Sequence, residues 1–141
     1  MKHFLISAVV MFILSLGLGF VVHGVLLKDD YAKLTGLMRD EAGQQRHFPA
    51  MLAAHAVLGL GVTALYRWGR DVGKGWVVEG VWFGLLLGVV ACLPTYLIYY
   101  AVQPMPGALV VKQIAFDMVA TVVLGFAVAA LNRDEPEMAE E

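Results

Sequence analysis

The sequence predicts an all-α integral membrane protein. Four transmembrane helices are expected to form an up-down bundle, with a short amphipathic surface helix between the first and the second. The chain of 141 residues is 60% hydrophobic and 16% charged, whereas a soluble domain averages about 45–50% apolar and about 25% charged residues. Four apolar runs are long enough to cross a bilayer. Turns rich in glycine or proline join the last three runs, which favours antiparallel neighbours.

The first apolar run covers residues 4–27 and follows the basic start Met-Lys-His, as in a signal peptide. The run is longer than the roughly 7–15 residues of a secretory hydrophobic region, and no small-x-small cleavage site stands out beyond it. About 20 apolar residues are enough to span the hydrocarbon core. We therefore predict a retained first transmembrane helix.

Residues 28–47 form the long polar stretch of the chain and carry charges of both signs. Tyr31, Leu34, Leu37 and Met38 recur within it at helical spacing. This pattern is typical of a short amphipathic helix lying on the membrane surface. Gly43 is expected to break that helix.

The remaining spans follow in order. The second is expected at residues 48–66, with Pro49 in its first turn, where proline is tolerated. The third, at 76–102, and the fourth, at 108–131, flank the turn Gln-Pro-Met-Pro-Gly, whose prolines end the helix. Residues 1–132 are thus predicted to form a single transmembrane domain, and residues 133–141 an acidic disordered tail.

The orientation of the chain rests on its positive charges. An even number of spans places both termini on one side of the membrane. The 10 lysines and arginines divide equally between the two sides, so the positive-inside rule alone chooses no orientation. Positive charge is densest in the compact loop at 67–74, whereas acidic residues dilute it in the 28–47 stretch. We therefore expect cytoplasmic termini.

The third apolar run carries a face of glycines. Gly80, Gly84 and Gly88 recur once per helical turn, and small residues at this spacing let two helices approach closely in lipid. Gly125 and Ala129 give a weaker version of this pattern in the fourth run. We predict that these glycines pack helices together, against a helix of the same chain or of a second copy.

Polar side chains are expected to converge at the end of the bundle away from the termini. In an up-down bundle, the ends of the first and third spans and the start of the second and fourth spans share one half of the membrane. The candidate ligand-binding residues there are His23, His55, Tyr96, Tyr99, Lys112 and Asp117. Ionisable groups at the depth of His55 and Asp117 are costly in lipid and mark functional sites by default.

These residues also have structural interpretations. Asp117 would pair with Lys112, or accept a hydrogen bond from a tyrosine hydroxyl, and so hold two helices in register. Histidine ligates metals and haem, and His23 and His55 lie at similar depth. The chain has neither a Cys-x-x-Cys-His motif nor a His-x-x-x-His pair, so we predict no metal and no cofactor and keep haem as an alternative.

The chain resembles a widespread family of small bacterial four-helix integral membrane proteins of unknown function. The stretches that carry the resemblance are HGVLLKDDYAKLTGL, at residues 23–37, and LPTYLIYYAVQPMPGALVVKQIAFDMV, at residues 93–119. His23 replaces the aromatic residue expected at its position. The resemblance implies the four-helix architecture and a multi-pass protein of the bacterial inner membrane, and it implies no mechanism.

Two functions follow as hypotheses. The first is a structural or accessory subunit that assembles with itself, or with a larger membrane complex, through its glycine-rich helix faces. The alternative is a membrane carrier or binding site for a proton, a small solute or haem, built on His55, Asp117 and the tyrosines of the third helix. The expected partners are the lipid bilayer and a second copy or larger complex, with no nucleic acid. Paired carboxylates and a serine beside a base are missing from the sequence, which argues against an enzyme.

Overall fold

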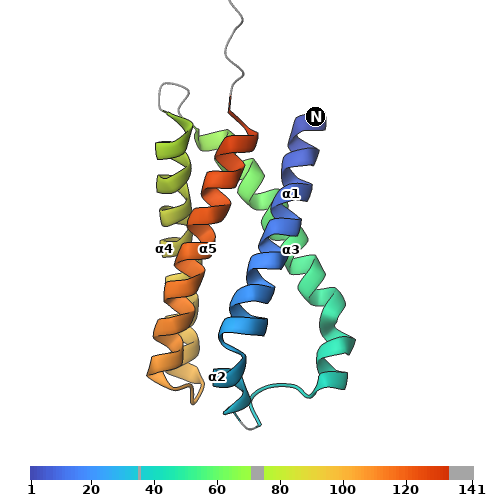
Figure 1. Cartoon of the computed structure of the whole chain (residues 1–141), viewed down its shortest axis with the longest axis vertical. Helices are drawn as coiled ribbons and strands as arrows, with labels where there is room; N and C mark the ends of the chain where they lie inside the picture. Colours follow the sequence, from blue (N-terminus) through green and yellow to red (C-terminus); the bar gives the residue numbers. More distant parts are fainter. Residues whose placement is uncertain (35, 71–74, 134–141) are drawn as a thin grey trace, which may run out of the picture.

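The computed structural model describes residues 1–34, 36–70 and 75–133. Every regular element in these ranges is a helix (Figure 1). In chain order the elements are α1 (Lys2–Gly19), the π-helix η1 (Phe20–Leu26), α2 (Lys28–Ala32), α3 (Glu41–Gly69), α4 (Trp76–Val102) and α5 (Gly107–Leu131). The predicted all-helical class is therefore confirmed. Residues 71–74 of one predicted loop and 134–141 of the predicted tail lie outside the described residues.

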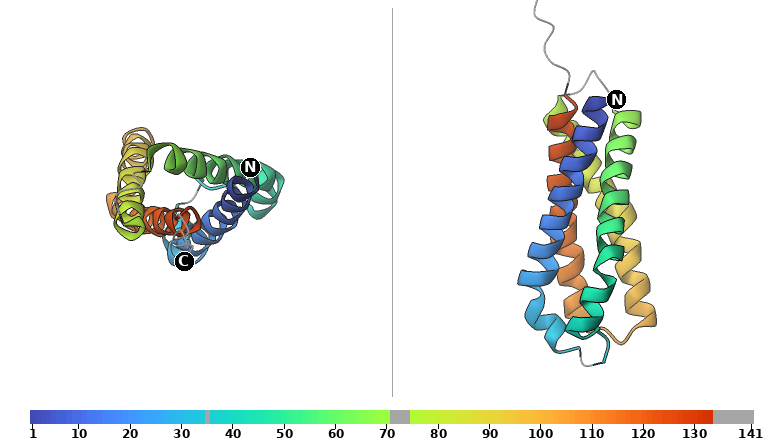
Figure 2. Two further views of the ribbon diagram at one scale, coloured as in Figure 1. Left: turned by 90° about the horizontal axis from the view of Figure 1, so that it is seen from above. Right: turned by 90° about the vertical axis from the view of Figure 1, so that its right-hand side faces the viewer.

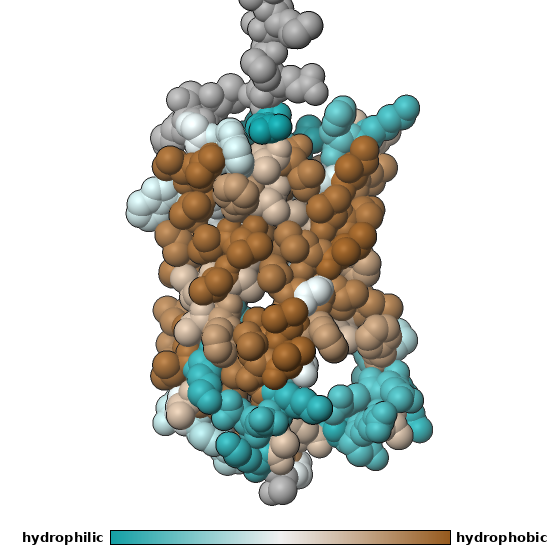
Figure 3. All heavy atoms as spheres, viewed as in Figure 1, coloured by the Kyte–Doolittle hydropathy of each residue, from teal (hydrophilic) through white to brown (hydrophobic). Residues whose placement is uncertain are grey.

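Four helical segments are long and apolar enough to cross a membrane: Lys2–Leu26, Glu41–Gly69, Trp76–Val102 and Gly107–Leu131. Figure 3 shows a broad apolar band between two polar ends. Within that band large apolar side chains point outward; Trp82, Leu86 and Val90 of α4 are 62%, 61% and 73% exposed. Such a surface is unfavourable in water but is the expected exterior of a protein in lipid.

The most extensive contact between helices of the described chain joins α4 to α5. Gly80, Gly84 and Gly88 are buried there. A Cβ atom added to Gly84 would lie 2.5 Å from the carbonyl oxygen of Thr121, and one added to Gly125 would lie 2.6 Å from the Cα atom of Gly84. The glycine face is therefore filled by a helix of the same chain, and the two backbones leave no room for a side chain.

The second close contact joins α1 to α3. Gly59 makes the approach possible, because a Cβ atom there would lie 2.7 Å from the carbonyl oxygen of Ala8. Next to it, the hydroxyl oxygens of Ser7 and Thr63 are 3.4 Å apart. The Asn132 side chain, just after α5, donates to the Ser7 hydroxyl at 2.9 Å. These polar contacts tie α1, α3 and the end of α5 together.

A cluster of buried apolar side chains joins α1, α3 and α5. Met11 is completely buried and packs in it with Val62, Tyr66, Leu124 and Val128. The N-terminus and the end of α5 lie at the same end of the molecule (Figure 1). This terminal half thus holds an apolar core around Met11, beside the polar contacts of Ser7.

The polar stretch after the first long helix differs from its prediction. Among its described residues, Lys28–Ala32 form a short helix, and α3 begins at Glu41 instead of near residue 48. The Asp40 carboxylate accepts a hydrogen bond from the Gly43 amide at 2.8 Å, so an N-cap starts a helix where glycine was expected to break one. Pro49 consequently lies inside α3 and not in its first turn.

The first long helix changes its winding before it ends. Its last seven residues, Phe20–Leu26, form the π-helix η1. A π-helical turn is wider than an α-helical one, and π segments occur frequently at functional sites. His23 lies in the middle of this segment.

The first half of α3 has few neighbours. α3 diverges from α1 towards its own N-terminus in Figure 1, and Figure 2 shows the same helix from two further sides. Phe48 and Met51 are 46% and 45% exposed. The buried residues of α3 are Gly59, Val62, Thr63 and Tyr66. Only the second half of α3 therefore belongs to the packed core.

Candidate functional site

A histidine and an aspartate meet at the end of the bundle away from the termini. The Nε2 atom of His23, from η1, lies 3.5 Å from the Oδ1 atom of Asp117, from α5. Their side chains are 36% and 17% exposed, respectively. The pair is therefore shielded on the carboxylate side and accessible on the histidine side.

The other oxygen of Asp117 is bonded to a third helix. The hydroxyl of Tyr96, from α4, donates a short hydrogen bond to Asp117 Oδ2. Of the two partners considered for Asp117, the tyrosine hydroxyl is the one the structure shows. The carboxylate thus links η1, α4 and α5 at one point.

Two residues that the sequence did not single out as site residues complete the cluster. The Tyr31 hydroxyl, from α2, lies 2.7 Å from His23 Nδ1. It also accepts a hydrogen bond from Gln113 Nε2 at 2.9 Å. Gln113 is 4% exposed and lies one turn before Asp117 on the same face of α5. We call His23, Tyr31, Tyr96, Gln113 and Asp117 the polar cluster.

The signals for Tyr31 and Gln113 were weak in the sequence. Tyr31 fitted the apolar face of an amphipathic helix, which concealed the use of its hydroxyl. Gln113 is an uncharged polar residue in an apolar run, and its spacing of one helical turn from Asp117 was the pattern that could have revealed it.

Lys112 forms an ion pair outside the polar cluster. Its ammonium group lies 2.7 Å from Asp30 Oδ2, on α2. The hydrogen bond from Lys112 holds the pKa of the Asp30 carboxyl below its ordinary value. Lys112 therefore fastens α2 to α5 beside the cluster and makes no contact with Asp117.

This ion pair predicts a pH-dependent stability. Because the pKa of Asp30 is lower in the folded state, its contribution is present above the unfolded value of about 3.9 and is lost as pH falls through the folded value. We expect Lys112→Met to be less stable than the parent protein at about pH 6, and the difference to shrink as the pH falls below about 4 and to vanish once the pH is below the folded value. Thermal unfolding in detergent micelles measures it.

Lys33→Met is the matched control for that experiment. Lys33 Nζ lies 4.0 Å from the other oxygen of Asp30, and its side chain is 76% exposed. We expect a smaller effect, because exposed ion pairs at this distance contribute little. A Lys112→Met defect that persists unchanged in acid would show that Lys112 acts through something other than Asp30.

His55 lies beside the polar cluster and belongs to a separate contact. Its Nδ1 atom is 3.0 Å from the Ser15 hydroxyl on α1. A Cβ atom on Gly19 would lie 3.2 Å from the His55 ring, so that glycine makes space for it. His55 is close enough to His23 for the two rings to interact electrostatically. Tyr99, by contrast, is 45% exposed and lies outside the cluster.

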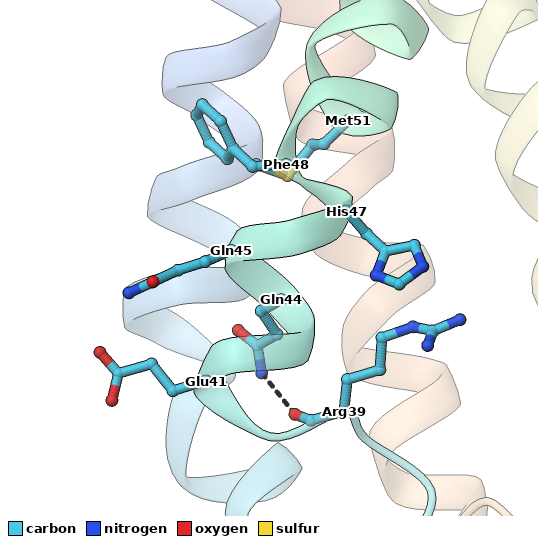
Figure 4. Close-up of a pocket in the computed structure, with 7 residues that line it drawn as sticks. All are labelled: Arg39, Glu41, Gln44, Gln45, His47, Phe48 and Met51. Atoms are coloured by element: carbon cyan, nitrogen blue, oxygen red, sulfur yellow. Dashed lines mark hydrogen bonds between the residues drawn. The ribbon is translucent and has the colours of Figure 1, made fainter.

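A surface hollow lies elsewhere, around the start of α3 (Figure 4). It is lined by Arg39, Glu41, Gln44, Gln45, His47, Phe48 and Met51. These residues come from one stretch of chain, and Figure 4 shows their side chains pointing to different sides of the helix. The hollow therefore has no opposing wall and does not assemble a site.

No family model matches the chain, and comparisons with curated proteins and with solved structures found no similar protein. Among the described residues, no group of three or more His, Cys, Asp or Glu side chains is arranged to hold a metal ion. Haem ligation by His23 would have to replace its contact with Tyr31 or with Asp117.

Proposed function

We propose that this chain is a multi-pass protein of the bacterial inner membrane that carries protons through its polar cluster. The four long helices would cross the bilayer in an up-down bundle with cytoplasmic termini. The outward-facing apolar side chains of the central band support insertion into lipid.

Direct contact between the polar atoms of the cluster is the observation that favours a proton. His23, Tyr31 and Gln113 are joined by contacts of 2.7 and 2.9 Å, and both carboxylate oxygens of Asp117 face a donor. A solute would have to displace one of these contacts. A proton needs no such space, and histidine and aspartate are the usual members of proton relays in membranes.

The difference between the two halves of the bundle, one accessible and one closed, favours a carrier over an open channel. The polar cluster is accessible through His23, whose side chain is 36% exposed. The terminal half is closed by the apolar core around Met11, which is completely buried. A proton bound at the cluster would therefore reach the other side only when the contacts of the terminal half open.

Reconstitution into lipid vesicles tests this proposal. We expect a pH gradient to decay faster across vesicles that contain the protein than across empty ones, and Asp117→Asn to remove the difference. Tyr99→Phe, an exposed position on the same helix as Tyr96, should leave the decay unchanged. Equal decay in protein-containing and empty vesicles, or undiminished decay with Asp117→Asn in a folded protein, would contradict a proton carrier.

A second candidate function is an accessory subunit that pairs with a second copy. The glycine face of α4 is filled by α5, so an assembly surface has to lie elsewhere. The first half of α3 is one segment that the rest of the described chain leaves uncovered, with Phe48 46% and Met51 45% exposed. We propose that a second copy packs against this half of α3.

Cysteine cross-linking tests the pairing. In a Cys92→Ser background, Met51→Cys should give a disulfide-linked dimer in membranes. Val90→Cys, on the lipid-facing side of α4 and 73% exposed, serves as the matched control and should stay monomeric. A monomer in both cases, with a monomer also in native mass spectrometry, would rule out this assembly.

A further inference from the structure

The buried side-chain amide of Gln113 makes a hydrogen bond through its nitrogen and none through its oxygen. Its Nε2 atom donates to the Tyr31 hydroxyl at 2.9 Å, whereas its Oε1 atom is buried and accepts no hydrogen bond from the described residues. A buried carbonyl oxygen without a donor is unfavourable. Because Oε1 accepts no hydrogen bond from the described residues, a rotation of the amide by 180° about its Cγ–Cδ bond would break only the hydrogen bond from Nε2 to Tyr31.

The hydrogen bond from Gln113 leaves the Tyr31 proton free for His23. The Tyr31 oxygen accepts the Gln113 N–H and lies 2.7 Å from His23 Nδ1. When Tyr31 donates to Nδ1, the proton of the neutral ring sits on Nε2. That places an N–H group opposite Asp117 Oδ1, at 3.5 Å.

We propose that His23 Nδ1 is the atom that takes up the proton, and that Tyr31 and Gln113 then reverse their hydrogen bonds. This inference rests on the proposed proton carrier. After protonation, Nδ1–H donates to the Tyr31 oxygen, and the Tyr31 proton turns to Gln113. The amide rotates so that Oε1 takes the place of Nε2 and accepts it. The only bond made is N–H at Nδ1, and Tyr31 keeps its proton throughout.

The surroundings of His23 suit this role. Asp117, from α5, stays opposite Nε2–H and balances the positive ring, while Tyr96, from α4, holds the other carboxylate oxygen. Burial raises the pKa of Tyr31, from α2, so its hydroxyl stays neutral.

The other charged groups near the ring are already engaged. Lys112 is paired with Asp30 at 2.7 Å. His55, from α3, is bonded to Ser15 and is within electrostatic range of His23.

Nitrogen NMR of histidine-labelled protein in detergent micelles tests the proposal without any variant. In alkaline solution, His23 should give the signals of the tautomer with its proton on Nε2. Titration from about pH 8 to about pH 5 should protonate Nδ1. An alkaline spectrum of the opposite tautomer would overturn the assigned direction of the chain.

Two variants test the reversal. Gln113→Glu replaces the donor of the neutral state by an acceptor, so Nδ1 should become protonated at a higher pH than in the parent protein. Gln113→Leu is the control, because it removes both the donor of the neutral state and the acceptor of the charged state and should shift the titration less than Gln113→Glu does. An unchanged titration in folded Gln113→Glu would exclude the reversal. Proton flux in vesicles is a separate measurement. Flux without the expected titration would contradict the reversal of hydrogen bonds alone. The expected titration without flux would contradict the proton carrier alone.

Discussion

Gly84→Ala should lower the free energy of unfolding by about 1–3 kcal/mol, the usual cost of forcing extra atoms into a packed interior. The added Cβ atom would lie 2.5 Å from the carbonyl oxygen of Thr121 and 2.6 Å from the Cα atom of Val122. Both are backbone atoms of α5, so neither can turn aside as a flexible side chain would. The clash can be relieved only if α4 and α5 move apart.

Gly61→Ala is the matched control for this variant. Gly61 lies in α3, and an added Cβ atom there has no neighbour within 4 Å. Alanine is more favourable than glycine inside a helix by about 1 kcal/mol, so the stability of this variant should be unchanged or slightly higher than that of the parent protein. Unfolding of both variants in the same detergent gives the comparison. Equal stability of the two would show that α4 and α5 do not depend on close backbone approach.

The second large effect is expected in the polar cluster. Tyr96 donates a short hydrogen bond to the Asp117 carboxylate, and hydrogen bonds to charged groups contribute about 1.5–3 kcal/mol. A double-mutant cycle of Tyr96→Phe and Asp117→Ala should therefore give a coupling energy of about 2 kcal/mol. Unfolding free energies of the parent, the two single variants and the double variant supply the cycle.

Tyr99 provides the reference for that cycle. It follows Tyr96 by three residues on α4, and its side chain is 45% exposed. Tyr99→Phe combined with Asp117→Ala should show coupling near zero, because the two residues share no contact. A similar coupling energy in both cycles would mean that the measured value reflects a general change in α4 and not the Tyr96 hydrogen bond.

Composition and helix length were enough to predict the fold class. The boundaries predicted for the third and fourth long helices, 76–102 and 108–131, agree with α4 and α5 to within one residue. Those boundaries are marked by Gly75, Pro104 and Pro106, residues with strong local preferences. Local chemistry decided the structure at these positions, so the sequence was sufficient.

The prediction failed where local signals competed. Gly43 and Pro49 both suggested a helix boundary, yet α3 runs through both. The cap supplied by Asp40 starts α3 before Gly43, and the helix continues through Pro49. The π-helix around His23 had no signal in the sequence, because a wider turn is set by the partners its side chains find.

The polar cluster was predictable in its location but not in its contacts. Depth along the helices placed His23, Tyr96 and Asp117 in the same half, and these three meet. The rotation of α5 about its axis, which places Lys112 next to Asp30, depends on packing between segments that are far apart in the sequence. Periodicity within one helix does not contain that information.

The contacts differ in how far apart their residues lie in the chain, and this bears on the order of folding. Tyr96 and Asp117 are 21 residues apart, and a short turn at 103–106 closes the α4–α5 hairpin. Ser7 and Thr63 are 56 residues apart, and Tyr31 and Gln113 are 82 apart. Closing a longer loop costs more entropy, so we expect α4 and α5 to pair first. By the same argument, we expect the hydrogen bond between Asn132 and Ser7, which are 125 residues apart, to form last and to mark a completely folded chain.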